Sequence, residues 1–301
     1  MIRALAPLAF ACFFALSPVA TQASDVTINT AAGPATVPFE PAKTVAFDIA
    51  AIDTLDAIGV MPVGIVNRLY VDYLGKIEGQ AAIVGTLFEP DFEALNAMQP
   101  DLIILGPRTA ASAEALQRFA PTIDMSIWGD DLLQQTMGRL AAYGQIFNRT
   151  ETADRLKSEF QALIDAARQA VKGKGKALIV MTNGPKISAY GEDARFGWLH
   201  RELGIAVAND GIASSRHGEA ISFEYIQQVN PDWLIVIDRA AAIGQVGDNA
   251  SQTLDNALVA DTTAWKQDQI IYLDSAKAYI ASGGIQATGD IIRTITDAFS
   301  K

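Results

Sequence analysis

The sequence is poor in the residues that carry out most enzymatic chemistry. Its 301 residues include one cysteine, Cys12, and two histidines, His200 and His217. It contains no nucleophile-elbow, phosphate-loop or zinc-protease motif, and no glycine-rich dinucleotide fingerprint follows the first predicted strand. Catalysis through a covalent intermediate therefore has few candidate residues. These absences argue against an enzyme.

Positive charge is also scarce. The chain carries 23 lysines and arginines against 34 aspartates and glutamates, a formal net charge of −11. Proteins that bind nucleic acid neutralise phosphates with lysine and arginine, so this balance argues against a nucleic-acid partner. It does not argue against a small anionic ligand, because salt screens distant charges and a few local arginines can dominate.

The first 23 residues are typical of a cleavable signal peptide. Arg3 is followed by a short apolar run, and small residues up to Ala23 suit a cleavage site. The apolar run is too short to span a membrane. Cleavage would remove Cys12 and leave a mature chain without cysteine, which suits a soluble periplasmic protein that needs no disulfide.

The remaining pattern predicts two α/β lobes. Apolar strands alternate with short helices over residues 24–129 and again over residues 173–301, which favours two mostly parallel sheets. Residues 24–42 suit an edge hairpin. Residues 130–172 are rich in helix formers, and Thr150 is the expected N-cap of the longer of two helices. Apolar residues recur there at helical spacing, namely Leu156, Phe160, Leu163, Ile164 and Ala167. We expect this segment to bridge the lobes.

One stretch of the first lobe recurs in the second. Residues 92–108 read FEALNAMQPDLIILGPR and residues 223–239 read FEYIQQVNPDWLIVIDR, and matched positions lie 131 residues apart. Each copy predicts a short helix, a Pro-Asp turn and an apolar strand that leads to an arginine, Arg108 or Arg239. Ligands of open α/β sheets bind beyond the carboxyl ends of the strands. If the lobes face each other, both arginines point into one cleft; the alternative is two unrelated surface arginines.

The repeat also places Glu93 and Glu224 in the first turns of its helices. Interaction with the helix dipole is a sufficient structural reason for both glutamates. The start of each helix also lies at the edge where strands end, so both glutamates would rim the cleft, one on each lobe. That arrangement suits a docking partner that contacts both lobes, and the sequence leaves the two explanations open.

Three further residues follow predicted strands in the second half. Arg195 and His217 lie in glycine-flanked loops, where a solvated side chain is the simpler explanation. Tyr279 precedes Gly283 and Gly284, which open the last helix and offer N–H groups that could face an anion. One histidine and a few tyrosines cannot build a transition-metal site alone. They suffice to complete the coordination of Fe(III) held by another chelator.

Taken together, these segments resemble the periplasmic siderophore-binding proteins of bacterial ABC iron importers, in particular the group that binds catecholate and mixed-catecholate siderophores. The resemblance extends over nearly all of the mature chain. It rests on residues 47–59, 89–93, 188–191, 195–197, 217–218, 221–225 and 254–258.

The resemblance implies two Rossmann-like lobes joined by a rigid helical bridge, the class III periplasmic binding protein fold. It implies that Arg108, Arg195 and Arg239 hold an anionic ferric siderophore. In some relatives a histidine and a tyrosine bind the iron directly, and His217 and Tyr279 match those motifs. Glu93 and Glu224 match the glutamates that meet arginines of the inner-membrane permease. No intrinsic cofactor and a monomer are expected.

The chain departs from this family at one place. Relatives often carry a Tyr-Trp-Tyr cluster where this sequence has Lys277-Ala278-Tyr279. The loss of two aromatic side chains and the gain of a cation predict a more open pocket, or a pocket suited to a different or more acidic siderophore. Two alternatives stay open: a carrier of another chelate such as haem or cobalamin, and an exported α/β enzyme that uses His217 with nearby acids.

Overall fold

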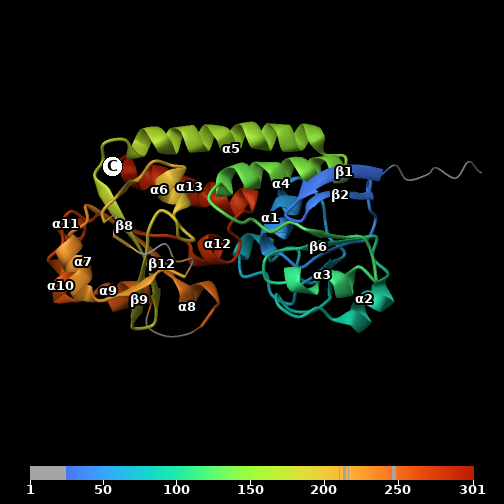
Figure 1. Ribbon diagram of the computed structural model, residues 1–301, viewed down its shortest axis with the longest axis horizontal. Helices are drawn as coiled ribbons and strands as arrows, with labels where there is room; N and C mark the ends of the chain where they lie inside the picture. Colours follow the sequence, from blue (N-terminus) through green and yellow to red (C-terminus); the bar gives the residue numbers. More distant parts are fainter. Residues whose placement is uncertain (1–24, 210, 213–214, 216, 246–248) are drawn as a thin grey trace, which may run out of the picture.

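Two α/β lobes lie side by side beneath one long helix, α5 (Thr150–Val171), which spans both of them (Figure 1). This computed structural model describes residues 25–209, 211–212, 215, 217–245 and 249–301. The expected signal peptide, residues 1–23, lies outside the described residues. Within those residues, no helix combines the length and the apolar character that crossing a membrane requires.

The first lobe is built on a fully parallel sheet, with strand order β5-β4-β3-β6-β7. An antiparallel hairpin precedes it, as expected. The hairpin strands are β1 (Asp25–Thr30) and β2 (Gly33–Pro38), and the sheet strands are β3 (Thr44–Ala46), β4 (Gly64–Ile65), β5 (Ala82–Ile83), β6 (Leu102–Leu105) and β7 (Thr122–Asp124). The helices are α1 (Ile49–Ala57), α2 (Phe92–Met98) and α3 (Ala113–Leu116), with 3-10 turns η1 (Asp72–Leu74) and η2 (Ala110–Ser112).

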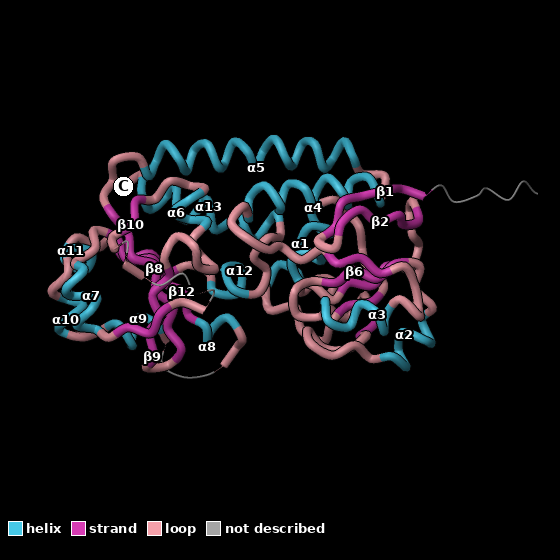
Figure 2. The backbone as a smooth tube through the Cα atoms, in the orientation of Figure 1, coloured by secondary structure: helices cyan, strands magenta, loops and turns pink. Residues whose placement is uncertain are grey.

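The second lobe has a mixed sheet of order β11-β9-β8-β12-β13, with β10 also beside β8. Strands β10 and β12 each pair in parallel with β8, and β13 pairs in parallel with β12. Strand β9 pairs antiparallel with both β8 and β11. The strands are β8 (Lys176–Asn183), β9 (Lys186–Tyr190), β10 (Ala206–Val207), β11 (Glu219–Ile221), β12 (Trp233–Asp238) and β13 (Ile270–Tyr272). The helices are α6 (Trp198–Arg201), α7 (Phe223–Val229), α8 (Arg239–Ala242), α9 (Ala250–Leu254), α10 (Ala257–Ala260), α11 (Thr263–Lys266), α12 (Ser275–Tyr279) and α13 (Ile285–Phe299). Figure 2 shows helices on both sides of the strands in each lobe.

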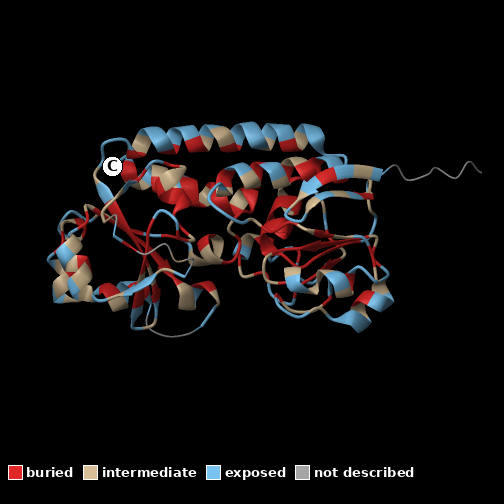
Figure 3. Cartoon of the chain, in the orientation of Figure 1, coloured by how far each residue is buried: buried red, intermediate tan, exposed pale blue. Residues whose placement is uncertain are grey.

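The strands of the second lobe serve two cores because side chains alternate between the faces of a sheet. Along β12, Ile235 and Ile237 join a core that is continuous with that of the first lobe. Leu234 and Val236 face the other way, into a separate cluster under the outer helices. The buried residues, red in Figure 3, accordingly extend from one lobe to the other beneath α5. The lobes therefore share one hydrophobic core.

The bridge consists of α4 (Leu132–Ile146) and α5, with a break between them at residues 147–149. Of the five residues at helical spacing, Phe160, Ile164 and Ala167 are buried, whereas Leu156 and Leu163 are half-buried against the same core. The expectation that Thr150 caps α5 is wrong. Arg149 occupies the N-cap position without a capping side chain, and Thr150 is already helical.

The last helix, α13, returns beneath the bridge and contacts both α5 and α1 (Figure 1). Its first turn meets Asp53, a fully buried residue of α1. The Asp53 carboxylate accepts hydrogen bonds from the backbone N–H groups of Gln286 (2.9 Å) and Ala287 (3.0 Å), and from the Tyr73 hydroxyl. A side chain of the first lobe thus caps the helix that closes the second lobe.

This contact corrects the expectation that the glycines before α13 face a bound anion. The anion at this helix terminus is the chain's own Asp53. Gly284 allows the close approach, because a Cβ atom there would lie 2.5 Å from the Asp53 carboxylate.

Asp53→Asn tests the strength of this cap. An amide carries two N–H donors where the carboxyl group carries at most one O–H, so at least one buried N–H is left without a partner. We expect the free energy of unfolding to fall by about 2–3 kcal/mol at pH 5, from urea denaturation followed by tryptophan fluorescence. Asp154→Ala, which removes an exposed carboxylate of α5, should change it by less than about 0.5 kcal/mol.

The loss of stability in Asp53→Asn should depend on pH. Burial raises the pKa of Asp53 to about 7 despite its hydrogen bonds, whereas an unfolded aspartate has a pKa of about 3.9. Folding then takes up a proton between these values, and wild-type stability falls as the pH rises through this window. The Asn variant lacks this proton uptake, so its deficit should shrink between about pH 4 and 7. A constant or growing deficit would mean that Asp53 is already ionised at the lower pH.

Candidate functional site

The sequence repeat is also a structural repeat. Helices α2 and α7 each end at a residue in the left-handed conformation, Gln99 (φ 52°) and Asn230 (φ 44°). The aspartate of each Pro-Asp turn then accepts a backbone N–H bond of 2.8 Å, Asp101 from Lys43 and Asp232 from Lys176. These bonds tie the turn to the neighbouring strand, so β6 and β12 enter their sheets in the same way.

Each copy of the repeat delivers its arginine to the carboxyl end of its strand. Arg108 lies just beyond β6, and Arg239 follows β12 as the first residue of α8. The buried carboxylate of Asp238 fixes the second turn, since it accepts from the N–H groups of Ala241 (3.0 Å) and Ala250 (2.8 Å).

Arg195 arrives from the loop between β9 and α6. Gly197 closes this loop, where a Cβ atom would lie only 1.7 Å from the carbonyl oxygen of Glu192. The tight turn explains the glycine of the Arg-Phe-Gly motif and fixes the position of the preceding arginine.

All three arginines converge on Tyr279 at the end of α12. Arg108 and Arg195 donate hydrogen bonds of 3.1 and 2.6 Å to the same backbone carbonyl of Tyr279. The Arg195 guanidinium lies 4.1 Å from the centre of the Tyr279 ring, and that of Arg239 lies 5.9 Å from it. The structure therefore brings the three arginines, which come from both lobes, to one tyrosine.

These residues line a cavity of about 500 Å³ between the lobes, hereafter the front cavity. Its apolar wall comes from both lobes and includes Tyr70, Phe88 and Ile243. Phe88 is 63% exposed and offers a ring to the cavity. Among the described residues, no aspartate or glutamate lines this cavity. It is a cationic and aromatic site.

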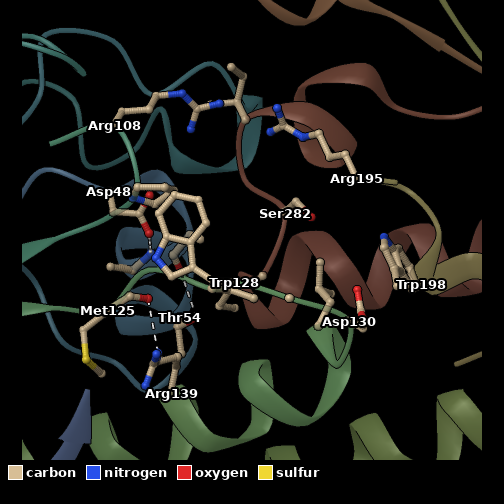
Figure 4. A pocket seen from close by; sticks show the side chains of 18 of the residues that line it. Asp48, Thr54, Arg108, Met125, Trp128, Asp130, Arg139, Arg195, Trp198 and Ser282 are labelled. Atoms are coloured by element: carbon tan, nitrogen blue, oxygen red, sulfur yellow. Dashed lines mark hydrogen bonds between the residues drawn. The ribbon is translucent and has the colours of Figure 1, made fainter. Parts of the chain in front are cut away.

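A second cavity of about 240 Å³, the rear cavity, lies on the other side of Arg108 and Arg195 (Figure 4). The two arginines line both cavities, and in Figure 4 they lie opposite Arg139. Asp48 lines only the rear cavity. Burial raises the pKa of its carboxyl group to about 6, although the nearby charge of Arg108 and a hydrogen bond from the Ala51 N–H both act to lower it. The carboxyl group that interacts with Arg108 thus faces the rear cavity and does not line the front cavity.

His217 is exposed and, within the described part of the chain, lines neither cavity. Its backbone carbonyl accepts a hydrogen bond of 3.0 Å from the hydroxyl of Tyr190. Tyr190 in turn lies within electrostatic range of Arg195, Tyr279 and Arg239. The structure thus places the backbone of His217 against Tyr190 of the second lobe.

Glu93 and Glu224 are both exposed in the first turns of α2 and α7. Figure 1 shows these two helices at opposite outer ends of the molecule. A hydrogen bond with the Ser222 side chain holds the pKa of Glu224 below its usual range. Both carboxylates are accessible to a partner that reaches across the two lobes.

The expected cation at position 277 does not reach the front cavity. Lys277 forms ion pairs with Asp290 (2.8 Å) and Asp274 (3.4 Å) and lies 5.5 Å from the centre of the Tyr73 ring. Ala278 is buried. The prediction of a more acidic ligand on the basis of Lys277 therefore loses its support.

The family profile for periplasmic binding proteins matches residues 45–277. The chain belongs to the periplasmic binding protein family. It is 35% identical over 269 residues to the petrobactin-binding protein YclQ of Bacillus subtilis, covering 88% of this chain and 84% of that protein. It is 31% identical to the ferric-anguibactin-binding protein FatB of Vibrio anguillarum, with coverages of 86% and 83%.

Solved structures of family members agree with this assignment. The structure of YclQ superimposes with a TM-score of 0.85 at 32% identity and covers 92% of this chain and 99% of its own. The periplasmic catecholate-siderophore binding protein VctP of Vibrio cholerae gives a TM-score of 0.85 at 32% identity, with coverages of 91% and 100%. This periplasmic binding protein therefore has the predicted class III fold.

Sequence reasoning missed several residues of the front cavity. Tyr70 and Phe88 follow the short strands β4 and β5, whose two residues each gave no strong pattern. Arg68 was also missed. It lies three residues beyond β4, as Arg108 lies three residues beyond β6. The rule that ligands bind beyond the carboxyl ends of strands, hereafter the strand-end rule, identified Arg108 and would also have identified Arg68.

The arginine cluster predicts which tyrosine of this binding protein ionises first. Burial raises the pKa of Tyr279, but a hydrogen bond with Arg239 and the charges of Arg195, Arg239 and Arg108 outweigh burial and lower it overall. The pKa is raised at five other tyrosines, which are Tyr73, Tyr143, Tyr190, Tyr225 and Tyr272.

In an ultraviolet titration of the phenols, the first step should therefore disappear in Tyr279→Phe. It should move to higher pH in Arg239→Met, which loses the hydrogen bond and one charge. Persistence of the first step in Tyr279→Phe would show that another tyrosine is the acidic one.

Proposed function

We propose that this protein is a periplasmic solute-binding protein that captures an anionic ferric siderophore, of catecholate or mixed-catecholate type, for an ABC importer. The observation that carries the proposal is the convergence of Arg108, Arg195 and Arg239 on Tyr279, in a cavity that no aspartate or glutamate lines among the described residues. Relatives named for binding petrobactin, ferric anguibactin and catecholate siderophores support it.

The chemistry of the cavity suits such a ligand. A ferric catecholate complex is a bulky anion whose charge is spread over oxygens attached to flat rings. Arginine stays charged, offers planar donors to those oxygens and stacks on aromatic rings. Three converging guanidinium groups repel one another, and an anion between them relieves that repulsion. The same charges favour an anionic complex over a neutral chelate such as cobalamin.

The proposal extends to the iron itself as part of the cargo. Tyr279 carries a phenol whose pKa the arginines lower, and a phenolate is a good ligand for Fe(III). His217 is the second proposed ligand, through the turn that Tyr190 holds against the wall of the second lobe. Both residues would complete the coordination of iron that a siderophore leaves partly open.

Arg195→Ala should weaken binding of a ferric tris-catecholate by about tenfold or more, because one charge-assisted hydrogen-bonding group is lost. Quenching of tryptophan fluorescence during titration measures the affinity. Arg118→Ala removes an exposed arginine that lines neither cavity and should leave the affinity unchanged. Wild-type protein should also keep the visible colour of the complex through desalting, whereas an enzyme that turns the ligand over would not. Equal affinities of wild type and Arg195→Ala would contradict the arginine site.

We further propose that residues 24–129 and 173–301 act as lobes, joined by residues 130–172, after export by the signal peptide at residues 1–23. The loaded monomer would dock on its inner-membrane permease through one glutamate per lobe, Glu93 and Glu224. Their exposure at opposite ends of the molecule supports a partner that contacts both lobes.

The double variant Glu93→Arg and Glu224→Arg should separate docking from capture. Reversed charges would repel arginines on the permease, so cellular uptake of ferric siderophore should fall by about tenfold or more while affinity in solution is retained. Glu151→Arg reverses an exposed charge on α5 and serves as the control. Normal uptake by the double variant would assign both glutamates to their helix dipoles alone.

A further inference from the structure

A fourth arginine, Arg68, joins the two lobes at the margin of the front cavity. It comes from the loop after β4 in the first lobe, and its Nη1 donates a hydrogen bond of 3.4 Å to the carbonyl of Ile243 in the second. Its guanidinium lies 4.8 Å from the centre of the Tyr70 ring. Tyr70 and Ile243 both line the front cavity, so Arg68 contacts one wall residue from each lobe.

The second lobe leaves space for this guanidinium. Ile243 is the C-cap residue of α8, the short helix that begins with Arg239. Gly244 follows with a φ of 67°, and a Cβ atom there would lie 2.0 Å from Nη2 of Arg68. A side chain at position 244 would therefore displace the arginine. The glycine lets Arg68 lie against the end of α8.

The partner of Arg68 in this arrangement is a weak one. An N–H···O distance of 3.4 Å lies beyond the usual range of a hydrogen bond, and a neutral carbonyl is a poorer acceptor than an anion. Among the described residues, no carboxylate lies within ion-pair distance of Arg68. The Arg68 side chain is exposed. It can therefore leave the Ile243 carbonyl and bind an anionic group of a ligand without breaking a buried contact.

We propose that Arg68 is a specificity-determining residue that binds an anionic group at the periphery of the ligand. This inference rests on the proposed function, since the ligand is the ferric siderophore held by the three inner arginines. Those arginines meet the charge of the ferric centre, whereas Arg68 at the margin meets an additional carboxylate on the ligand backbone. The protein then prefers a ferric catecholate that carries such a carboxylate over one that does not.

A matched pair of probes tests this preference. Two hexadentate tris-catecholate chelators on one scaffold, differing only in a pendant carboxylate, are loaded with Fe(III) and titrated against the protein. Wild type should bind the carboxylate-bearing complex about fivefold more tightly, the value of an exposed ion pair. The ratio should fall to about one in Arg68→Ala, retain part of its value in Arg68→Lys, and remain at the wild-type value in Arg118→Ala.

The outcomes separate this inference from the proposed function. If wild type binds neither complex, the proposed function fails. If wild type binds both and Arg68→Ala keeps the same ratio, or weakens both complexes equally, Arg68 has no role in selecting the carboxylate and the inference fails alone. A ratio that also declines with added salt in wild type, but not in Arg68→Ala, identifies the selected interaction as ionic.

Discussion

The geometry of the site depends on one contact, the capping of α13 by the buried carboxyl group of Asp53. Asp53 belongs to the first lobe, whereas α13 directly follows the segment that carries Tyr279. Arg108 of the first lobe and Arg195 of the second both donate to the carbonyl of Tyr279. A shift of α13 would move this acceptor away from one arginine or the other. The cap therefore holds the residue on which the two lobes meet.

The shared hydrophobic core has the same effect over a larger area. Helices α4, α5 and α13 contribute to one cluster that also includes the sheets of both lobes. Opening the lobes as rigid bodies would expose part of this cluster and uncap α13, and both changes cost free energy. Under the proposed function, a ligand would therefore meet arginines that are already in position. Such preorganisation reduces the entropy lost on binding, although the repulsion among the arginines has to be sustained by the fold while the cavity is empty.

The strand-end rule accounts for what the sequence could predict. Arg108 and Arg239 occupy equivalent positions in two copies of one local motif, so their placement required only short-range reasoning. Lys277 shows the limit of such reasoning, because its direction depends on Asp290, a residue of the following helix that no local pattern connects to it. The anion facing α13 was missed for the same reason, since Asp53 lies more than two hundred residues earlier in the chain. Contacts between distant segments decide which charges reach the cavity.

The two lobes contribute unequally to the front cavity, and this bears on how its specificity is set. The second lobe supplies Arg195, Arg239 and Tyr279, whereas the first supplies Arg108 and an apolar wall that includes Leu87 and Phe88. Two of the three arginines that line the cavity, and Tyr279, thus come from the second lobe, whereas both lobes contribute apolar side chains. A change in the wall would alter which rings fit without disturbing the charge that draws the complex in. Because the walls near Arg68 come from loops after short strands, they tolerate substitution better than the buried turns that hold Arg108 and Arg239. Substitutions in these loops would therefore change the shape of the cavity while Arg108 and Arg239 stay in place.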